Sequence, residues 1–428
     1  MNAAAVLRTA DRFLMNTYRR PPLVFTRGRG CYVYDHRGRR YLDFLGGIAV
    51  NALGHAHPAV VNVLRQQAAR AIHLSNLYHN EFQGPLAEKL AACSGMDRVF
   101  FTNSGSEAVE TALKLARAYA KQKPNGAPRT RLLALENAFH GRTFGALTVT
   151  ATAKYRDPFA PLLPEVAFVR LNDVADLEAK FDTRVCALIL EPIQGEGGIH
   201  PISEAFYSRA RQLCTAHDAA MIVDEIQCGL GRTGRWFAYQ KFPERPDLVT
   251  VAKPLAAGLP LGAVLAREKF AAAFAPGLHG STFGGGPLSC AVALAVLRTI
   301  QRERLLENVR ARGAELLAGL YELARRFHFI REIRGEGLML GIELETDAAP
   351  YVEQALARGL LLNAAHERVL RLLPPYILTA GQVRTFLSCL ADVLASTPRA
   401  KSSRHAPSPT PTRAIARAAR VGGHQETP

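Results

Sequence analysis

Residues Leu248–Ala266 read LVTVAKPLAAGLPLGAVLA, and Lys253 is the only charged residue among them. Moving an ammonium group from water into apolar surroundings is unfavourable unless the group is paired or loses its proton. A desolvated lysine loses its proton more easily, and a neutral amine can form a Schiff base with a carbonyl compound. The stretch therefore indicates either an incidental buried lysine or a nucleophile.

The residues around Lys253 predict its local conformation. Leu248–Ala252 is rich in β-branched residues and predicts a buried strand. Pro254 disfavours the α region for the residue before it, so we expect Lys253 to be extended, just past the strand end. A loop should follow at Gly258, Pro260 and Gly262. These breakers and the central lysine argue against a membrane span.

Apolar segments of strand length alternate with amphipathic helical segments between about residues 84 and 266. The predicted strands, buried on both faces, are Val99–Thr102, Arg131–Leu135, Cys186–Glu191, Ala220–Asp224 and Leu248–Ala252. Helical patterns lie between them, as at Glu107–Lys121 and Glu204–His217. This alternation predicts an α/β domain with a mostly parallel sheet.

Both ends of the chain differ from this central part. Short β-like pieces, CYVYD and YLDFLG, precede it, and a long helical pattern from Arg312 leads to further strands and a last helix ending near Ser396. We expect residues 61–300 to form a large domain, and residues 1–60 and 301–397 to form a smaller α+β domain. Residues 398–428, rich in Pro, Ser, Thr and Ala, predict a disordered basic tail.

Composition narrows the class of protein. The formal net charge is +16, but the tail alone carries six basic residues against Glu426, and no nucleic-acid-binding motif accompanies the charge. We therefore do not expect a nucleic-acid partner. Seven cysteines without a CxxC pair, and no visible secretory signal pattern, predict reduced thiols and a cytoplasmic location.

Several distinctive residues follow predicted strands, where ligands of parallel sheets bind. In FTNSGSEA, Ser104, Gly105 and Ser106 open a helix and form a candidate phosphate cradle, although an ordinary helix cap is the favoured explanation of these residues taken alone. Asp224 ends a strand and could keep a pyridine nitrogen protonated, making the ring an electron sink, or it is an exposed acid that begins a loop. Because strand residues alternate in direction, Asp224 and Glu225 should not both point into one pocket.

Two further segments carry candidate binding groups. Phe139 could stack on a ring, and Arg142 could bind a carboxylate in a forked geometry, although a core phenylalanine and a surface arginine are the simpler explanations. The glycine-rich run HGSTFGGG offers the hydroxyls of Ser281 and Thr282 as a second phosphate contact, or forms a turn.

Two further motifs are weaker evidence for a binding site. Gly229–Gly234 matches GxGxxG, but no convincing helix follows it, as dinucleotide binding would require. His55 and His57 lack an evident third metal ligand, so a turn before a helix starting near Pro58 is favoured and no metal site is predicted.

The order of the motifs resembles that of the class III pyridoxal-phosphate aminotransferases. The matching segments include LDFLGGIAVNALGHAHP, FTNSGSEAVETALKLAR, FHGRTFGALTVT, LILEPIQGEGG, VDEIQCGLGRTGRWFAY, VTVAKPLAAGLPLGA, HGSTFGGGPLSC and VLRLLPP. The resemblance implies the α/β fold of PLP-dependent transferase fold type I, with a seven-stranded sheet in the large domain. Where this family commonly has Asn in GGNP, the chain has Gly286, which puts the rigidity of that loop in doubt.

The resemblance also implies roles in binding pyridoxal 5'-phosphate. Lys253 would carry the cofactor and shuttle a proton, Asp224 would pair with the pyridine nitrogen, and Gln227 would reach the ring oxygen. Phe139 would stack on the ring. The remaining cofactor contacts would come from Gly105, Ser106, Glu225, Ile226 and, from a neighbouring subunit, Thr282.

Other residues match the family's substrate positions. Arg142 and Ser281 would hold the amino donor, and Glu196 and Arg371 match a pair that acts as a gate in related ω-aminotransferases. The implied reaction moves the terminal amino group of N2-acetyl-L-ornithine to 2-oxoglutarate in a homodimer with shared active sites. N-succinyl-diaminopimelate, succinylornithine, ornithine and 4-aminobutyrate are alternative donors. An NAD-dependent oxidoreductase, resting on the GxGxxG match alone, is a remote alternative.

Overall fold

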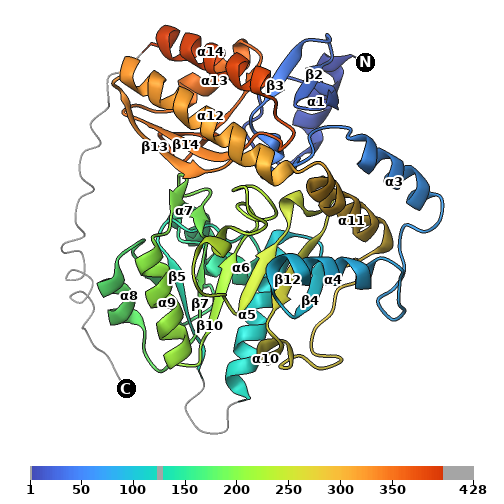
Figure 1. Ribbon diagram of the computed structural model, residues 1–428, viewed down its shortest axis with the longest axis vertical. Coiled ribbons are helices and arrows are strands. Elements are labelled where there is room, and N and C mark those ends of the chain that lie inside the picture. Colours follow the sequence, from blue (N-terminus) through green and yellow to red (C-terminus); the bar gives the residue numbers. More distant parts are fainter. Residues whose placement is uncertain (1, 123–128, 399–428) are drawn as a thin grey trace, which may run out of the picture.

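A seven-stranded sheet forms the centre of the protein. The computed structural model describes residues 2–122 and 129–398, and Figure 1 shows this sheet in the lower half of the molecule. In spatial order its strands are β4 (Arg98–Thr102), β12 (Gly262–Ala266), β11 (Leu248–Val251), β10 (Ala220–Asp224), β7 (Val185–Leu190), β5 (Arg131–Leu135) and β6 (Val166–Val169). Only β12 runs antiparallel to its neighbours, so the prediction of a mostly parallel sheet is confirmed.

Two strands of this sheet were not predicted. The strand β6 was not identified from the sequence, and Gly262 begins β12 instead of belonging to the preceding loop. Val251 of β11 pairs with Ala263 of β12, so the chain turns back after Lys253 and returns along the strand it has just left. The apolar stretch around Lys253 therefore forms two adjacent buried strands, β11 and β12, and the segment between them contains Lys253.

Helices cover both faces of the sheet because successive strand residues point in opposite directions. Val223 packs in a cluster with residues of α4 (Gln83–Ser94), α9 (Glu204–Ala216) and α11 (Pro287–Arg302). The adjacent Ile222 packs in another cluster, which contains residues of α5 (Gly105–Lys121). Both faces are thus apolar, as the near-continuous hydrophobic strands predicted.

A second core joins the two ends of the chain. Its C-terminal elements are α12 (Leu305–Arg326), α13 (Ala349–Ala357), α14 (Ala380–Ser396) and a sheet in the order β13 (Ile330–Glu336), β14 (Met339–Leu344), β17 (Val369–Leu372), β16 (Asn363–Ala365). The N-terminal strands β1 (Phe25–Arg29), β2 (Tyr32–Asp35) and β3 (Arg40–Asp43) form another sheet with β15 (Leu360–Leu361). Phe44 stacks on Phe386 with ring centroids 3.9 Å apart, which fixes the N-terminal strands against α14.

This second core contains residues from both ends of the chain, and the division into domains at residues 60 and 300 stays a prediction. One helix bridges the two parts, because α11 places Leu297 in the first core and Val296 in the second. The predicted basic tail lies outside the described residues, apart from Pro398.

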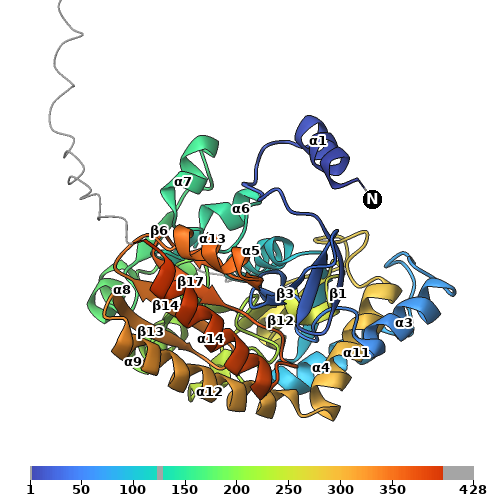
Figure 2. The same cartoon turned by 90° about the horizontal axis from the view of Figure 1, so that it is seen from above.

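The remaining helices are mostly short. Figure 2 shows α1 (Ala3–Phe13) standing apart from the body, and none of its residues is buried. The others are α2 (Gly46–Ala49), α3 (Pro58–Ala68), α6 (Phe144–Thr148), α7 (Ala153–Arg156), α8 (Val174–Lys180) and α10 (Glu268–Ala271). Within the described ranges, no helix has both the length and the apolar composition that crossing a membrane requires.

Candidate active site

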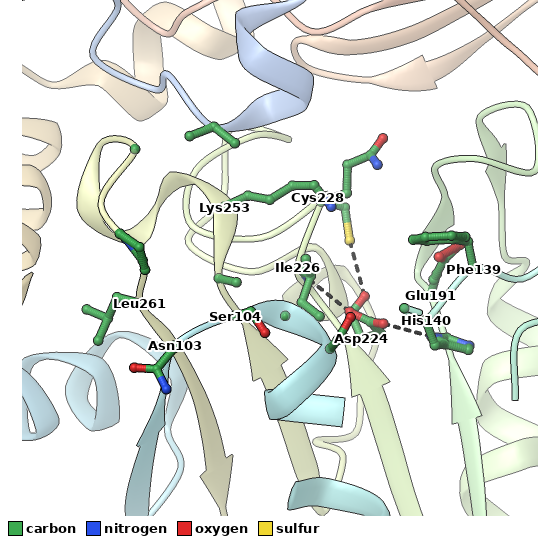
Figure 3. A pocket seen from close by; sticks show the side chains of 18 of the residues that line it. Asn103, Ser104, Phe139, His140, Glu191, Asp224, Ile226, Cys228, Lys253 and Leu261 are labelled. Atoms are coloured by element: carbon green, nitrogen blue, oxygen red, sulfur yellow. Dashed lines mark hydrogen bonds and ion pairs between the residues drawn. The ribbon is translucent and has the colours of Figure 1, made fainter. Parts of the chain in front are cut away.

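A cavity of about 500 Å³ lies at the carboxyl ends of the parallel strands. Of the residues predicted to form the site, it is lined by Gly105, Ser106, Phe139, Asp224, Ile226, Gln227 and Lys253. Figure 3 shows Lys253 above Asp224, with Phe139 and Glu191 at one wall and Ser104 near the opposite side. The tertiary structure therefore brings together residues from four separate strand ends, as expected for a parallel sheet.

Lys253 is partly buried at the carboxyl end of β11. Burial lowers the pKa of its ammonium group, while Asp224 opposes this shift. The prediction of an extended conformation is wrong, because Lys253 begins a short 3₁₀ helix that extends to Ala256. Pro254 is tolerated there because the first turn of a helix leaves its backbone N–H groups without intrahelical partners. A lysine with a lowered pKa is in its neutral, nucleophilic form more readily than one in water.

Asp224 is held in place on both carboxylate oxygens. The Nδ1 atom of His140 lies 2.7 Å from its Oδ2. The hydroxyl of Thr250 and the backbone N–H of Ile226 donate to Oδ1 at 3.1 and 3.0 Å. These contacts fix the orientation of a buried carboxylate in the cavity, as its predicted role requires.

Sequence reasoning gave no role to three residues near Asp224. His140 is buried, and its Nε2 has no hydrogen-bond partner in the structure. Glu191 lines the cavity directly after β7, and burial together with Asp224 raises its pKa well above the usual value. Thr250 lies within β11. A signal for Glu191 was available, because it is an acidic residue at the end of a strand of wholly apolar residues.

The N-terminus of α5 forms one end of the cavity. Ser104 caps this helix by accepting a hydrogen bond from the backbone N–H of Glu107 at 3.2 Å. The predicted ordinary cap is thus present, and Gly105 and Ser106 line the cavity as well. A Cβ atom on Gly105 would lie 2.9 Å from Ile226, so only glycine leaves that wall unobstructed.

Glu225 does not contribute its side chain to the cavity. Its carboxylate accepts hydrogen bonds from the backbone N–H groups of Ala238 and Tyr239 at 3.0 and 2.7 Å. Burial raises its pKa to about 7. The strand alternation expected for Asp224 and Glu225 explains this, and the side chain of Glu225 holds a neighbouring turn.

The predicted gate residues are in direct contact. The Nη1 atom of Arg371 donates to Glu196 Oε1 at 2.5 Å and to Gln227 Oε1 at 3.1 Å. Arg371 also donates from Nε to Asn363 at 3.3 Å, whereas its buried Nη2 has no hydrogen-bond partner among the residues that the structure describes. Because Gln227 lines the cavity, this network places a buried guanidinium beside it.

Arg142, Ser281 and Thr282 do not line this cavity. Arg142 is exposed, and its backbone N–H donates to Ser106 Oγ at 3.3 Å. The hydroxyl of Ser281 accepts a hydrogen bond from the side chain of Asn103, a cavity residue, at 3.2 Å. Thr282 is exposed. The first two residues therefore lie at the edge of the site, and Thr282 faces away from the chain's own core.

The loop carrying Ser281 and Thr282 is fastened by amide side chains. Asn76 donates to the carbonyls of Ser281 and Gly284 at 2.8 and 2.9 Å. Asn80 and Gln83 donate to the carbonyl of Gly285 at 3.1 and 2.9 Å. The loop is thus anchored without an asparagine at position 286.

The weaker motifs form structural features. Gly229–Gly234 lies in successive turns, with a short 3₁₀ helix at Ala238–Lys241 after it, so the helix that a dinucleotide site needs is not there. His57 caps α3, which begins at Pro58 as predicted, and His55 Nε2 lies 2.8 Å from Asp43.

Comparisons with known proteins are consistent with the site. The sequence profile described as Aminotransferase class-III matches residues 14–394. An acetylornithine aminotransferase of Caldanaerobacter subterraneus is 46% identical over 384 residues, which cover 90% of this chain and 97% of the relative.

Two solved structures share the fold over 92% of this chain at 33% identity. One is an ornithine aminotransferase of Toxoplasma gondii, with a TM-score of 0.88 and 95% of its chain covered, which has PLP at partial occupancy in its active site. The other is an acetylornithine aminotransferase of Elizabethkingia anophelis, with a TM-score of 0.83 and 99% of its chain covered.

Proposed function

Because the chain belongs to the class III aminotransferase family and is a PLP-dependent aminotransferase, we propose that it acts on N2-acetyl-L-ornithine. The terminal amino group passes to 2-oxoglutarate, giving N-acetyl-L-glutamate 5-semialdehyde and L-glutamate, a step of arginine biosynthesis. The observation that carries the proposal is that the partly buried Lys253 shares one cavity with a fixed carboxylate, Asp224. Similarity to proteins named acetylornithine aminotransferase supports the choice of donor.

The residues of the cavity fit pyridoxal 5'-phosphate. The N-terminus of a 17-residue helix, at Gly105 and Ser106, suits a phosphate group because helix N-termini favour anions. Asp224 suits a protonated pyridine nitrogen, and Lys253 suits the aldehyde carbon. Phe139 and Ile226 offer apolar surface to the ring. When bound, the cofactor supplies an aromatic ring that withdraws electrons from the substrate carbon.

The protein's own groups then have definite tasks. Burial keeps the amine of Lys253 in its neutral form more readily, so this amine can accept and return the proton at the substrate carbon. The hydrogen bonds from His140 and Thr250 keep the carboxylate of Asp224 aimed in one direction.

Glu196 and Arg371 suit the two half-reactions differently. A terminal amine has no carboxylate beside its reacting carbon, so the pairing with Glu196 satisfies the charge of Arg371. The acceptor 2-oxoglutarate does carry such a carboxylate, which can replace Glu196 on Arg371. Arg142, at the edge of the site, would then bind the distal carboxylate of the acceptor.

We also propose that the protein forms a homodimer with shared active sites. Exposed apolar side chains cluster in the segment before α4, where Leu77 is 86% and Tyr78 75% exposed. This segment holds the loop of Thr282 through Asn76, and Phe283 in that loop is 65% exposed. Such an apolar surface favours burial against a second copy, which would bring Thr282 to the partner's phosphate cradle.

We propose a cytoplasmic location because of the state of the cysteines. All seven cysteines are free in the structure, and five of them are buried. Reduced, unpaired thiols are typical of proteins kept in a reducing compartment.

One spectroscopic experiment tests the function. Purified holoenzyme should lose its cofactor absorption on addition of acetylornithine and regain it with 2-oxoglutarate. Succinyl-diaminopimelate, succinylornithine, ornithine and 4-aminobutyrate should produce slower changes at equal concentration. A faster response to any of these compounds would identify that compound, and not acetylornithine, as the preferred donor. A protein without cofactor absorption even after PLP addition would overturn the proposal.

A further inference from the structure

Tyr155 is the nearer of two aromatic rings beside Arg142. The guanidinium carbon of Arg142 lies 3.7 Å from the centroid of the Tyr155 ring and 5.5 Å from that of Phe139. The rings of Tyr155 and Phe139 meet edge to face, with centroids 6.2 Å apart at an interplanar angle of 86°. Tyr155 thus touches both the arginine at the edge of the site and a ring that lines the cavity.

This contact suits the task of a carboxylate-binding arginine. An arginine is long and carries considerable rotamer entropy, which is lost when it binds a ligand. Stacking occupies the flat face of the guanidinium and leaves its N–H edges free for a forked bond to a carboxylate. The exposed Arg142 is held at its base by the hydrogen bond from its backbone N–H to Ser106 Oγ. The ring of Tyr155 holds the guanidinium at the distal end of the side chain.

We infer that Tyr155 is a positioning residue for substrate carboxylates, acting through Arg142. The inference rests on the proposed function, because it takes Arg142 as the ligand of the distal carboxylate of 2-oxoglutarate. It extends that function to α7, a four-residue helix that contributes nothing to the cavity lining. By this inference, substrates that carry a carboxylate at the reach of Arg142 bind more tightly because the guanidinium is already oriented.

The test is a set of Tyr155 variants of the holoenzyme. Tyr155→Leu should raise the KM for 2-oxoglutarate and the inhibition constant of glutarate about fivefold, as expected for loss of a cation–π contact. The kcat should stay within about twofold, because the contact acts on binding and not on the reacting atoms. Tyr155→Phe keeps the aromatic face and should keep both constants close to those of the wild type.

A double-mutant cycle separates this role from a structural one. In the Arg142→Ala background, Tyr155→Leu should have almost no further effect on either constant. Phe168→Leu is a matched control, because it removes the ring that lies 4.5 Å from Arg156, the neighbour of Tyr155 in α7. This control should leave the KM for 2-oxoglutarate unchanged.

Two outcomes would overturn the inference. One is a Tyr155→Leu effect of the same size with and without Arg142, and the other is a Tyr155→Phe variant as weak as Tyr155→Leu. The KM is measured with the acceptor 2-oxoglutarate and the inhibition constant with its analogue glutarate. The acceptor is the same for every alternative donor. Failure of acetylornithine as a donor would therefore count against the proposed function only, and not against Tyr155.

Discussion

Arg371 is completely buried and pairs with Glu196, whose side chain is 32% exposed. A buried arginine cannot leave for solvent without losing its packing, whereas a partly exposed glutamate can move out when another carboxylate takes its place on the arginine. The same Nη1 atom of Arg371 that bonds Glu196 also bonds Gln227 in the cavity. The asymmetry in exposure makes Glu196 the member of the pair that yields to an incoming carboxylate.

Glu196→Ala should therefore affect the two half-reactions unequally. Without Glu196 the charge of Arg371 stays unpaired when a terminal amine binds, but it is satisfied by the carboxylate of glutamate. We expect kcat/KM for acetylornithine to fall about tenfold more than that for glutamate, which corresponds to about 1.4 kcal/mol. Single-turnover measurements with each donor provide the comparison, with Glu196→Asp as the charge-retaining control. Equal losses for both donors would contradict the gate.

Lys253→Met should stabilise the cofactor-free protein at neutral pH. Burial lowers the pKa of Lys253 from its usual 10.5, so the unfolded chain binds this proton more tightly than the folded one. The wild type consequently gains stability as the pH rises from the lowered pKa towards 10.5. We expect the variant to unfold about 2 °C or more above the wild type at pH 7, with a difference that shrinks at higher pH. Calorimetry over this range tests the sign, and the exposed Lys154→Met should show no such trend.

His140→Phe should weaken cofactor binding without removing any group that we assign to the cofactor. The substitution leaves Asp224 Oδ2 without the partner that lies 2.7 Å away. A hydrogen bond to a charged group contributes about 1.5–3 kcal/mol, so the dissociation constant of PLP should rise about tenfold or more. Titration followed by absorbance measures the constant. Thr250→Val should have a smaller effect through Oδ1, and Thr250→Ser, which keeps the hydroxyl, should have almost none.

Mixed dimers should reveal shared active sites. Subunits carrying Lys253→Ala and subunits carrying Thr282→Glu should each form impaired homodimers. If Thr282 serves the partner's site, a mixed dimer contains one site with both Lys253 and Thr282 intact. Activity should then reappear on refolding the two variants together, approaching half that of the wild type for each mixed dimer. No recovery in a mixture shown to contain mixed dimers would contradict sharing.

Gly286→Asn should stabilise the protein slightly. Gly286 is the N-cap of α11 and has φ −58° and ψ 148°, which any residue can adopt. A Cβ atom would lie 3.3 Å from the carbonyl oxygen of Phe283, a close contact that a small shift relieves. An asparagine adds a capping side chain and restricts the unfolded chain, for about 0.5–1 kcal/mol. Thermal unfolding measures the gain, and Gly286→Ala, which lacks the cap, should gain less.

The sequence was most informative where a property depends on neighbouring residues. The strands β10 and β11 and the helix α9 follow from apolar periodicity, and their observed bounds differ from the predicted ones by at most one residue. The strand β12 was missed because Pro260 and Gly262 indicate a loop, whereas the pairing with β11 and β4 that makes this segment a strand is a contact between distant residues.

The sequence by itself determined that Lys253 lies just after a strand, that Ser104, Gly105 and Ser106 open a helix, and that Asp224 and Glu225 diverge. Only the tertiary structure decided the partners of these groups. His140 and Asp224 are 84 residues apart in the chain, and Glu196 and Arg371 are 175 apart. Periodicity records whether a side chain is buried, because burial follows from the direction of each residue within its own element. Which buried groups meet depends on how the elements pack, and that is decided by the whole fold.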